Sequence, residues 1–350
     1  MYKLDLNYKG LLLLQKILFK DKEAKKYLEK DEFAEAAKIL LRNQRLDWQM
    51  LADGYSSLEN QQVKEFQFDG FVIKVQYNTG RIHSALVKID EESLNSRKCF
   101  LCSENRPVEQ KAIQYKKDFL IICNPFPILH EHFTIPSIDH TPQRIRNHFN
   151  TFLSVSKDLS KYYNVFYNGQ KCGASAPDHL HFQAVTKNSL PIESDIKMIK
   201  SEYGITLSED FDLTVTGIDD TVRRFILIEG KKDRDVQYAF EKFYKVFEMI
   251  SAEDEEPMFN ILSVYTEKKG WKIFLFARSK HRPSFYYFEG EERILLSPAA
   301  IDFSGLCVVP VKEHFDRITK DHLIKIFREV SLGKEAFEFL KSGLERRLNE

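Results

Sequence analysis

The first sixty residues carry apolar side chains at intervals of three and four, the spacing of an amphipathic helix. The pattern runs through DKEAKKYLEKDEFAEAAKILLRNQRLDWQMLADG and stops near Gly54. Glycine just after the last periodic residue is a common helix stop signal. Residues 1–60 are therefore predicted to form a helical N-terminal extension whose role is packing and not chemistry.

The period changes from residue 66, where FQFDGFVIKVQYN alternates apolar and polar side chains in the manner of a strand. The short runs DFLIICNPF and HEHFTIPSI are also predicted to be extended. Thr141 can then cap a helix and Pro142 suits its first position, which predicts a helix over QRIRNHFNTFLSVSKDLSKYY. The segments NVFYNG and HLHFQAV are predicted as the next two strands.

The second half of the chain repeats this theme in pattern and barely in identity. RDVQYAFEKFYKVFEMI has helical periodicity, and FNILSVYTEKKGWKIFLFARSKHRP reads as two strands followed by a basic turn, with the acidic loop SAEDEEP between them. We predict an α+β fold in which a unit of antiparallel sheet and packed helices is duplicated. The predicted parts are the extension 1–60, a first half 61–195, a second half 196–320 and a C-terminal helix 321–350.

Composition and charge place the chain among globular proteins. Of its 350 residues, 43% are hydrophobic and 30% charged, which suits one large or two smaller domains. The 52 basic and 52 acidic residues balance to a formal net charge of +0, without the basic excess of a protein that coats nucleic acid. Apolar runs stay below the roughly 18 residues of a membrane span, and the N-terminus lacks a signal-peptide layout. We expect a cytoplasmic protein that binds neither nucleic acid nor membrane.

Five cysteines are present, and Cys99 and Cys102 form a close pair. An odd count with one such pair fits a metal site better than a disulfide framework. Two thiolates at this spacing suit tetrahedral zinc. The alternative is a reduced pair that binds no metal.

The stretch GASAPDHLHFQAV places His179, His181 and Gln183 at alternate positions. In a strand these three side chains share one face, and the apolar residues between them point to the core. The small residues before them let phosphates approach backbone N–H groups that hold anionic oxygens. A neutral imidazole is a good nucleophile towards phosphorus, and Gln183 can donate its amide as charge develops. The pattern indicates nucleotidyl transfer.

The segment VFYNGQKCGASAPDHLHFQ resembles the active-site segment of the histidine-triad superfamily. It is most similar to the branch of galactose-1-phosphate uridylyltransferase, diadenosine tetraphosphate phosphorylase and GDP-galactose phosphorylase, which has His-x-His-x-Gln. The resemblance implies that His181 attacks the α-phosphate and becomes nucleotidylated, while Gln183 contacts the transferred phosphate. The residues implied to hold the nucleotide phosphates are Asn168, Gly173 and Ser175.

The segment KCFLCSENRP resembles the Cys-x-x-Cys segment of the uridylyltransferases. This resemblance implies a structural zinc ion that fastens the cysteine loop to the catalytic strand without activating water. The four implied ligands are Cys99, Cys102, His140 and His179. His130 and His132, which alternate on their own strand, are competing ligands.

Further segments suggest how substrates are held. CNPFP resembles a family segment that cradles the nucleoside, which implies roles for Asn124 and Phe126, although Pro125 replaces an aspartate that contacts ribose in some relatives. QYNTGRIHSA resembles an early segment in which an arginine faces the nucleotide, so Arg81 is the candidate; the alternative is a solvent-facing arginine. FARSKHRP is a basic turn, either solvated or suited to the phosphate of a second substrate. Its candidate ligands are Arg278, Lys280 and Arg282.

The expected function is a nucleotidyltransferase that works by double displacement on a nucleoside diphosphate derivative, with phosphate or a sugar phosphate as second substrate. FARSKHRP and SPAAIDFSGLCVVP resemble GDP-galactose phosphorylase-like proteins and favour phosphorolysis of a nucleoside diphosphate sugar or dinucleotide. The cysteine pair favours the alternative, a hexose-1-phosphate uridylyltransferase. Water as acceptor is another alternative. A non-catalytic, zinc-stabilised nucleotide-binding protein is the alternative from a different class.

Overall fold

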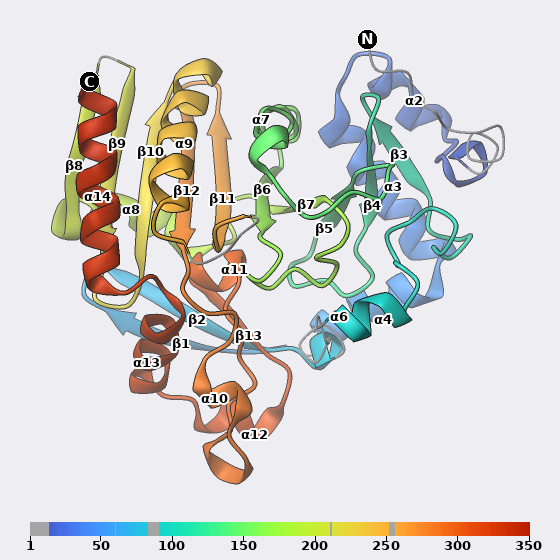
Figure 1. Ribbon diagram of the computed structural model, residues 1–350. Coiled ribbons are helices and arrows are strands. Elements are labelled where there is room, and N and C mark those ends of the chain that lie inside the picture. Colours follow the sequence, from blue (N-terminus) through green and yellow to red (C-terminus); the bar gives the residue numbers. More distant parts are fainter. Residues whose placement is uncertain (1–13, 60, 83–90, 211, 252–255) are drawn as a thin grey trace.

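One ten-stranded sheet runs across the molecule and carries both halves of the chain (Figure 1). Its strands follow the order β3-β4-β5-β7-β6-β11-β12-β10-β9-β8, and all neighbouring pairs are antiparallel. The start of the N-terminal extension and the centre of SAEDEEP lie outside the described residues. The computed structural model describes residues 14–59, 61–82, 91–210, 212–251 and 256–350.

The first half of the chain supplies one side of this sheet. Its five strands are β3 (Ala112–Tyr115), β4 (Phe119–Cys123), β5 (His132–Pro136), β6 (Tyr163–Asn168) and β7 (His181–Thr186). The first three are neighbours in chain order, and β7 then inserts between β5 and β6. Because β7 pairs with a strand on each side, its direction and register are fixed by two ladders.

The second half repeats this strand order. Its five strands are β8 (Gly204–Asp210), β9 (Leu213–Asp219), β10 (Arg224–Gly230), β11 (Phe259–Thr266) and β12 (Gly270–Ala277). Here β12 lies between β10 and β11, as β7 lies between β5 and β6. The halves meet where β6 pairs with β11, and Asn168 stands opposite Asn260 in that ladder. A site near this junction therefore receives residues from both halves.

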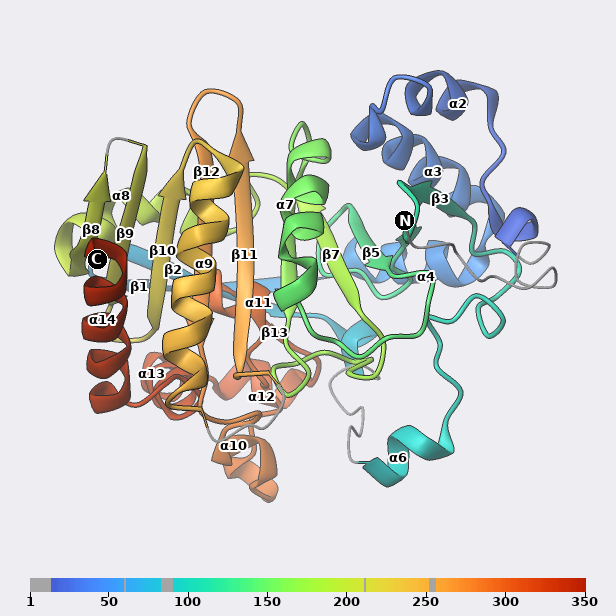
Figure 2. The same cartoon turned by 45° about the horizontal axis from the view of Figure 1, so that its top comes forward.

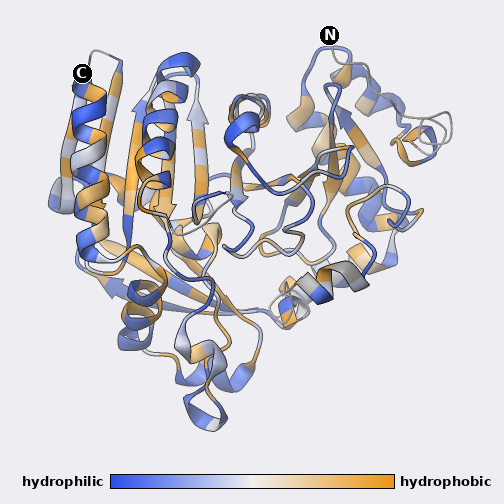
Figure 3. Cartoon of the chain, viewed as in Figure 1, coloured by the Kyte–Doolittle hydropathy of each residue, from blue (hydrophilic) through white to orange (hydrophobic). Residues whose placement is uncertain are grey.

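Four long helices cover one face of the sheet. They are α3 (Phe33–Asp47), α7 (Phe149–Asp158), α9 (Asp233–Glu248) and α14 (Lys334–Asn349). Figure 2 shows α7, α9 and α14 in front of the strands, and Figure 3 shows apolar and polar segments alternating along them. Their buried residues join those of the strands in one large apolar cluster. Within the described ranges, no helix has the length and apolarity needed to cross a membrane.

The opposite face is covered by a smaller sheet and a second group of helices. Its elements are β1 (Gln62–Phe68), β2 (Phe71–Tyr77), β13 (Leu306–Val309), α8 (Pro191–Tyr203), α11 (Ala300–Phe303), α12 (Lys312–Arg317) and α13 (Lys320–Val330). The extended structure predicted from residue 66 is confirmed, but it forms a hairpin, β1–β2, outside the main sheet. Gly70, with φ of +78°, makes the turn of this hairpin.

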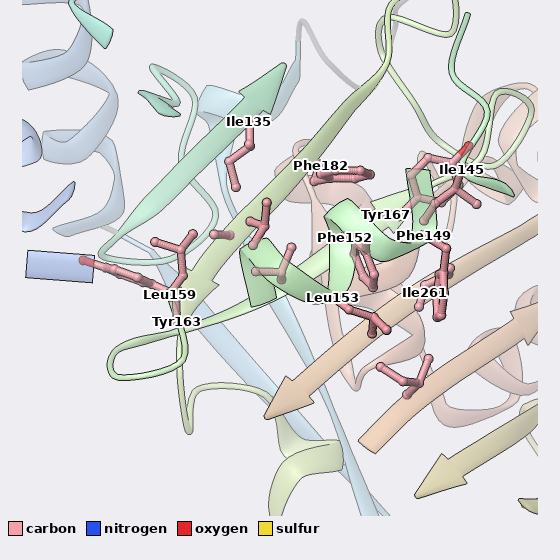
Figure 4. Close-up of a cluster of buried hydrophobic side chains, with 14 of the residues drawn as sticks. Ile135, Ile145, Phe149, Phe152, Leu153, Leu159, Tyr163, Tyr167, Phe182 and Ile261 are labelled. Atoms are coloured by element: carbon pink, nitrogen blue, oxygen red, sulfur yellow. The ribbon is translucent and has the colours of Figure 1, made fainter. Parts of the chain in front are cut away.

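Phe182 anchors β7 in the apolar cluster that also contains Phe152 of α7 (Figure 4). Its ring centroid lies 5.3 Å from that of Phe152 on α7 and 5.4 Å from that of Phe119 on β4. Side chains alternate between the two faces of a strand. Burying Phe182 therefore turns the side chains of His181 and Gln183 to the other face.

The helix predicted to start at Thr141 begins only at Phe149, after a 3-10 turn at Arg146–His148. The preceding residues make long-range bonds that a helix would break. The Gln143 side chain bonds to backbone groups of two strands, and the Ile145 N–H donates to the Glu256 carboxylate. Tertiary contacts therefore outweigh the local capping signal.

The C-terminal segment 321–350, predicted as one helix, contains two. The first is α13, and the chain then turns through residues 331–333 before α14. The turn is held because the Leu332 carbonyl accepts a hydrogen bond from the Arg224 guanidinium at 2.9 Å.

The N-terminal helices α2 (Lys22–Leu28), α3 and α4 (Gln49–Glu59) are part of the main core. Asp21 caps α2 by accepting from the N–H groups of Glu23 and Ala24. Leu40 of α3 and Leu51 of α4 are fully buried in the cluster that includes β3 and β4. Helices are present in this region as predicted, but α4 continues through Gly54, where the pattern predicts a stop, and ends at Glu59. Their packing makes them more than an appendage.

We predict that Leu40→Ala lowers the free energy of unfolding by about 2–5 kcal/mol, since it leaves a cavity in the shared core. Leu46→Ala on the same helix is the control, because Leu46 is 82% exposed and its loss should change stability by about 0.5 kcal/mol or less. Urea unfolding measures both. If Leu40→Ala lowered the free energy of unfolding as little as Leu46→Ala does, α3 would not contribute to the core.

Candidate active site

A cavity of about 460 Å³ lies near the junction of the two halves. It receives side chains from β7, from the turn 173–175, from the loop after β4 and from segments between 281 and 308. Most of the residues proposed from the sequence as catalytic or nucleotide-binding line it. They are Arg81, Asn124, Phe126, Asn168, Gly173, Ser175, His181, Gln183 and Arg282.

His181 presents a nucleophilic nitrogen in this cavity. Its Nδ1 lies 2.8 Å from the carbonyl oxygen of His179, so Nδ1 carries the proton and donates it to that carbonyl. Nε2 therefore keeps its lone pair. The side chain is only 5% exposed, and burial lowers the pKa of His181 to about 4. The ring is thus neutral near neutral pH, which is the nucleophilic form.

Gln143, predicted to lie in a helix, instead holds the start of β7. Its Oε1 accepts from the His181 backbone N–H at 2.7 Å, and its Nε2 donates to the carbonyls of His181 and Asn168 at 3.0 and 2.9 Å. The β6–β7 ladder runs only as far as the pair Phe166–Gln183. The fully buried Gln143 carboxamide bridges the two strands beyond that point, and only its position in the fold reveals this role.

His179 and His181 do not share a strand face, because β7 begins at His181. His179 lies in the preceding bend, where its ring turns towards the two cysteines while its carbonyl turns towards His181. The predicted alternation holds for His181 and Gln183, and both line the cavity. His179 therefore links a second cluster to His181.

That second cluster consists of the four predicted metal ligands, whose ligand atoms all lie within 4.8 Å of one another. The Nδ1 of His179 lies 3.4 Å from the Cys99 Sγ and 3.6 Å from the Cys102 Sγ, and the Nδ1 of His140 lies 3.2 Å from the Cys102 Sγ. Two sulfur and two imidazole ligands form the donor set of a tetrahedral zinc site. The cluster can therefore bind a metal ion such as zinc.

Neighbouring groups orient this donor set for a metal. The Nε2 of His179 donates to the Ser137 carbonyl at 2.9 Å, which leaves Nδ1 with its lone pair towards the thiols. The Nε2 of His140 lies 3.6 Å from an oxygen of Asp178. The competing candidates lie elsewhere, since His130 is exposed and His132 bonds to Gln183.

The small-residue turn approaches the second half so closely that only glycine fits at its start. Gly173 has φ of +92°, and an added Cβ would lie 2.7 Å from the Cβ of Ala299. Ser175 follows in the cavity wall, and its carbonyl accepts from Arg97 at 2.9 Å. The turn is thus held from both sides.

Arg81 lies in the cavity wall, and its Nη1 donates to the Phe126 carbonyl at 2.8 Å. Burial lowers the pKa of Arg81 to about 10, still above neutral pH. Asp302, which the sequence analysis missed, also lines the cavity and accepts from the N–H groups of Ala299 and Val308. Burial raises the pKa of Asp302 to about 6.

The loop after β4 is folded by the side chain of Asn124. Its Oδ1 accepts from the Phe126 N–H at 2.9 Å, and its Nδ2 lies 3.3 Å from the Thr134 hydroxyl. Asn124 therefore shapes the wall that carries Phe126. The N-terminal helical region adds Trp48 and Met50 to the lining, a contribution that its helical pattern did not indicate.

Arg278 and Lys280, proposed as phosphate ligands, lie outside the cavity lining. Arg278 is 2% exposed, and its guanidinium donates to four backbone carbonyls and to the Asn260 side chain. Lys280 pairs with Glu329 at 2.9 Å near the surface. Of the three cations in this turn, Arg282 reaches the cavity. Arg278 does not line the cavity because it directly follows β12, which ends at Ala277, and its side chain is buried.

Arg278 acts on the cavity through two asparagines. The Asn260 Oδ1 accepts from Arg278 at 2.9 Å, which directs the Asn260 Nδ2 to the Asn168 Oδ1 at 2.8 Å. The Ala300 N–H also donates to the Asn168 Oδ1. Both acceptor positions of Asn168 are therefore used, and its Nδ2 is the group left to donate to a ligand.

Two families match this chain. Residues 40–186 match a family described as a domain of unknown function (DUF4922), and residues 213–349 match the family described as GDPGP1-like, C-terminal domain. Each of these matches spans less than half of the chain. The first match starts inside the predicted extension 1–60, in agreement with the packing of α3. A search of curated proteins gave no significant match.

The fold is similar to that of yeast Ap4A phosphorylase Apa2. The structure of that enzyme without ligand gives a TM-score of 0.54 at 14% identity over 81% of this chain and 96% of that chain. The complex with Ap4A gives 0.51 at 14% identity over the same shares, and the complex with AMP gives 0.50 at 15% over 79% and 92%. The match to a GDPGP1-like family and the similarity in fold to an Ap4A phosphorylase confirm the predicted resemblance to the branch that contains these phosphorylases and the uridylyltransferase.

We predict that the purified protein binds about one zinc ion per chain, as a four-ligand site requires. His140→Ala should weaken zinc binding by at least about tenfold, because even the outer partners of metal ligands contribute 10–100-fold. Elemental analysis during titration with a chelator measures the loss. His130→Ala is the control, and equal zinc retention by both variants would exclude His140 as a ligand.

We predict that Arg278→Met lowers the free energy of unfolding by more than about 3 kcal/mol, because several buried acceptors lose their donor. Lys280→Met, at an exposed position nearby, is the control and should lower the free energy of unfolding by about 1 kcal/mol or less. Urea unfolding measures both. Wild-type stability combined with a raised KM for the second substrate would instead make Arg278 a phosphate ligand.

Proposed function

We propose that the protein is a nucleotidyltransferase that forms a covalent intermediate on His181, and that its reaction is phosphorolysis of a nucleoside diphosphate sugar or a dinucleotide. The observation that carries the proposal is the tautomer of His181. The His181 Nδ1–H donates to the His179 carbonyl, so the proton is on Nδ1 and Nε2 keeps its lone pair, in a ring that lines the cavity. A buried neutral imidazole next to a small-residue turn is suited to attack a phosphorus atom.

In the first half-reaction, the Nε2 lone pair forms a bond to the α-phosphorus of the substrate. The bond from that phosphorus to the bridging oxygen breaks, and the phosphorylated fragment leaves with the electron pair. The imidazole gains positive charge, which the Nδ1–H bond to the His179 carbonyl stabilises. Gln183, the Asn168 Nδ2 and the backbone of residues 173–175 are placed to meet charge on the phosphate oxygens.

In the second half-reaction, an oxygen of inorganic phosphate attacks the same phosphorus. The bond from Nε2 to phosphorus breaks, the nucleoside diphosphate leaves, and His181 returns to its neutral form. Arg282 is the cation of the basic turn that lines the cavity, and it is the candidate to bind the acceptor. Arg81 is the corresponding candidate on the nucleotide side.

The comparisons support a nucleotide as the ligand. The C-terminal part matches a GDPGP1-like family, and the similar yeast fold is that of an Ap4A phosphorylase seen with AMP and with Ap4A. Zinc, when bound, would supply a structural cross-link between the loop 99–102 and His179. The ligands Cys99, Cys102, His140 and His179 would hold it, and the carbonyl of the same His179 accepts a hydrogen bond from His181.

We also infer that the sheet arose by duplication of one α+β unit. The matching strand orders of the two halves, each with a helix before its fourth strand, support this inference. The halves correspond to the segments 61–195 and 196–320 proposed from the sequence. The second half has kept the architecture, and its contribution to the cavity comes from the segments after β12.

The proposal predicts that α-labelled substrate transfers its label to the chain. Wild-type protein should retain label after denaturation, and His181→Ala should reduce labelling by about 10³-fold or more, since it removes the nucleophile. The exposed residue His130 gives the control variant, His130→Ala, which should label normally. A panel of nucleoside diphosphate sugars and dinucleotides, each with phosphate, hexose 1-phosphate or water as acceptor, identifies the reaction.

Tight binding of nucleotide without any labelled protein would contradict the proposal and favour a nucleotide-binding protein. Release of label by hexose 1-phosphate alone would favour the uridylyltransferase, and release by water alone would favour a hydrolase.

A further inference from the structure

We propose that His132 is a positioning residue that sets the orientation of the Gln183 carboxamide, so that its NH₂ group faces the bound phosphate. This inference rests on the proposed function, because it concerns the group that meets charge during nucleotidyl transfer. His132 entered the sequence analysis only as a competing metal ligand, and the metal cluster does not include it.

The two side chains belong to neighbouring strands and share a sheet face. In the β5–β7 ladder, Gln183 stands opposite Thr134, which places His132 on the diagonal to Gln183. Thr134 and Gln183 line the cavity, while His132 is fully buried behind them. The Nε2 of His132 lies 3.0 Å from the Oε1 of Gln183.

The hydrogen bonds around His132 determine its tautomer. The Ile128 N–H lies 3.3 Å from the Nδ1 of His132, and a backbone N–H can only donate. Nδ1 must therefore be the acceptor and lack a proton. A neutral ring then carries its proton on Nε2, and this N–H donates to the Gln183 oxygen.

Burial and a nearby cation keep the ring of His132 in this neutral state. Burial is the main cause and Arg81 the second, and together they lower the pKa of His132 to about 3, although the bond to Gln183 opposes the shift. A second proton would bind to Nδ1, and the hydrogen bond from the Ile128 N–H to Nδ1 would then be lost. The ring is therefore a fixed donor to Gln183 and a fixed acceptor from the loop after β4.

The donor on His132 decides which end of the Gln183 carboxamide, the oxygen or the NH₂ group, faces the cavity. A carboxamide has one acceptor oxygen and one donor NH₂ group. Because His132 bonds to the oxygen, the NH₂ group is the end left for the cavity. That end attracts a phosphate oxygen, whereas the carbonyl end would repel it.

Asn168 on the neighbouring strand follows the same principle by different contacts. Its oxygen accepts from Asn260 and from the Ala300 N–H, which leaves its NH₂ group for the ligand. Two carboxamides, from β6 and β7, are thus fixed with their donors available to one cavity. This agreement supports a built anion site over a chance orientation of one glutamine.

The test is a double-mutant cycle on the rate of label transfer in a single turnover. His132→Phe keeps a ring of similar size and removes both hydrogen bonds, so Gln183 becomes free to turn. We expect transfer to slow by about 10–100-fold, close to the effect of Gln183→Ala. The double variant should be no slower than Gln183→Ala within about twofold, because His132 acts through Gln183. Multiplied effects, or wild-type rates in His132→Phe, would overturn the proposal.

Two further variants separate positioning from damage to the fold. His132→Gln keeps an N–H donor within reach of Gln183 and should recover at least about tenfold of the rate lost in His132→Phe. His130→Phe, at an exposed position two residues before β5 begins, is the matched control and should behave as wild type. Folding of each variant is checked by thermal unfolding. A folded His132→Gln as slow as His132→Phe would overturn the proposal.

An NMR measurement that needs no turnover tests the role of His132 separately from the nucleotidyltransferase proposal. Long-range ¹H–¹⁵N spectra of the histidine rings, assigned by the signal missing in His132→Gln, report the tautomer directly. A proton on Nε2 is expected for His132, and a proton on Nδ1 would overturn its positioning role. If wild-type protein takes up no label, the nucleotidyltransferase proposal fails, and the spectrum still decides the role of His132.

Discussion

The burial of Phe182 is the interaction on which the site depends. Its ring packs between β4 and α7 in the largest apolar cluster, and this fixes which way every side chain of β7 points. His181 and Gln183 are directed to the cavity because their neighbours are directed to the core. A shift of β7 by one residue would exchange the two faces and bury the nucleophile in the core. The apolar residues of the motif therefore matter as much as its polar ones.

Around this strand, main-chain groups do much of the positioning. The carbonyl of His179 sets the tautomer of His181. The ring of His179 belongs to the cluster of four candidate metal ligands, so this one residue connects that cluster to the cavity. Gln143 ties β7 to β6 at the point where their ladder ends. Gly173 allows contact with Ala299 of the second half. Hydrogen bonds and close packing thus hold the nucleophile from several directions, and such preorganisation favours electrostatic catalysis.

The second half of the chain completes the cavity and stabilises it. Its own strands repeat the order of the first half, yet the residues that line the site come from the loops and short helix after β12. Arg278 holds several carbonyls of this region and orients Asn260, which in turn orients Asn168. A cation near the cavity can therefore stabilise the surrounding structure, because it satisfies buried acceptors that would otherwise lack a donor.

The sequence by itself determined the local features of this protein: the helical front end, the strands around the motif, the close cysteine pair and the His-x-His-x-Gln spacing. These depend on side-chain periodicity and on short spacings, which the local backbone carries into the fold. The resemblance to a known family added the candidate metal ligands His140 and His179 and the residue proposed as nucleophile. Only the tertiary structure decided that Gln143 leaves the predicted helix, that Arg278 is buried while Arg282 lines the cavity, and that Asp302 joins the site. The physical reason is that burial and hydrogen-bond partners come from segments far apart in the chain, and the residue types involved are equally common on protein surfaces.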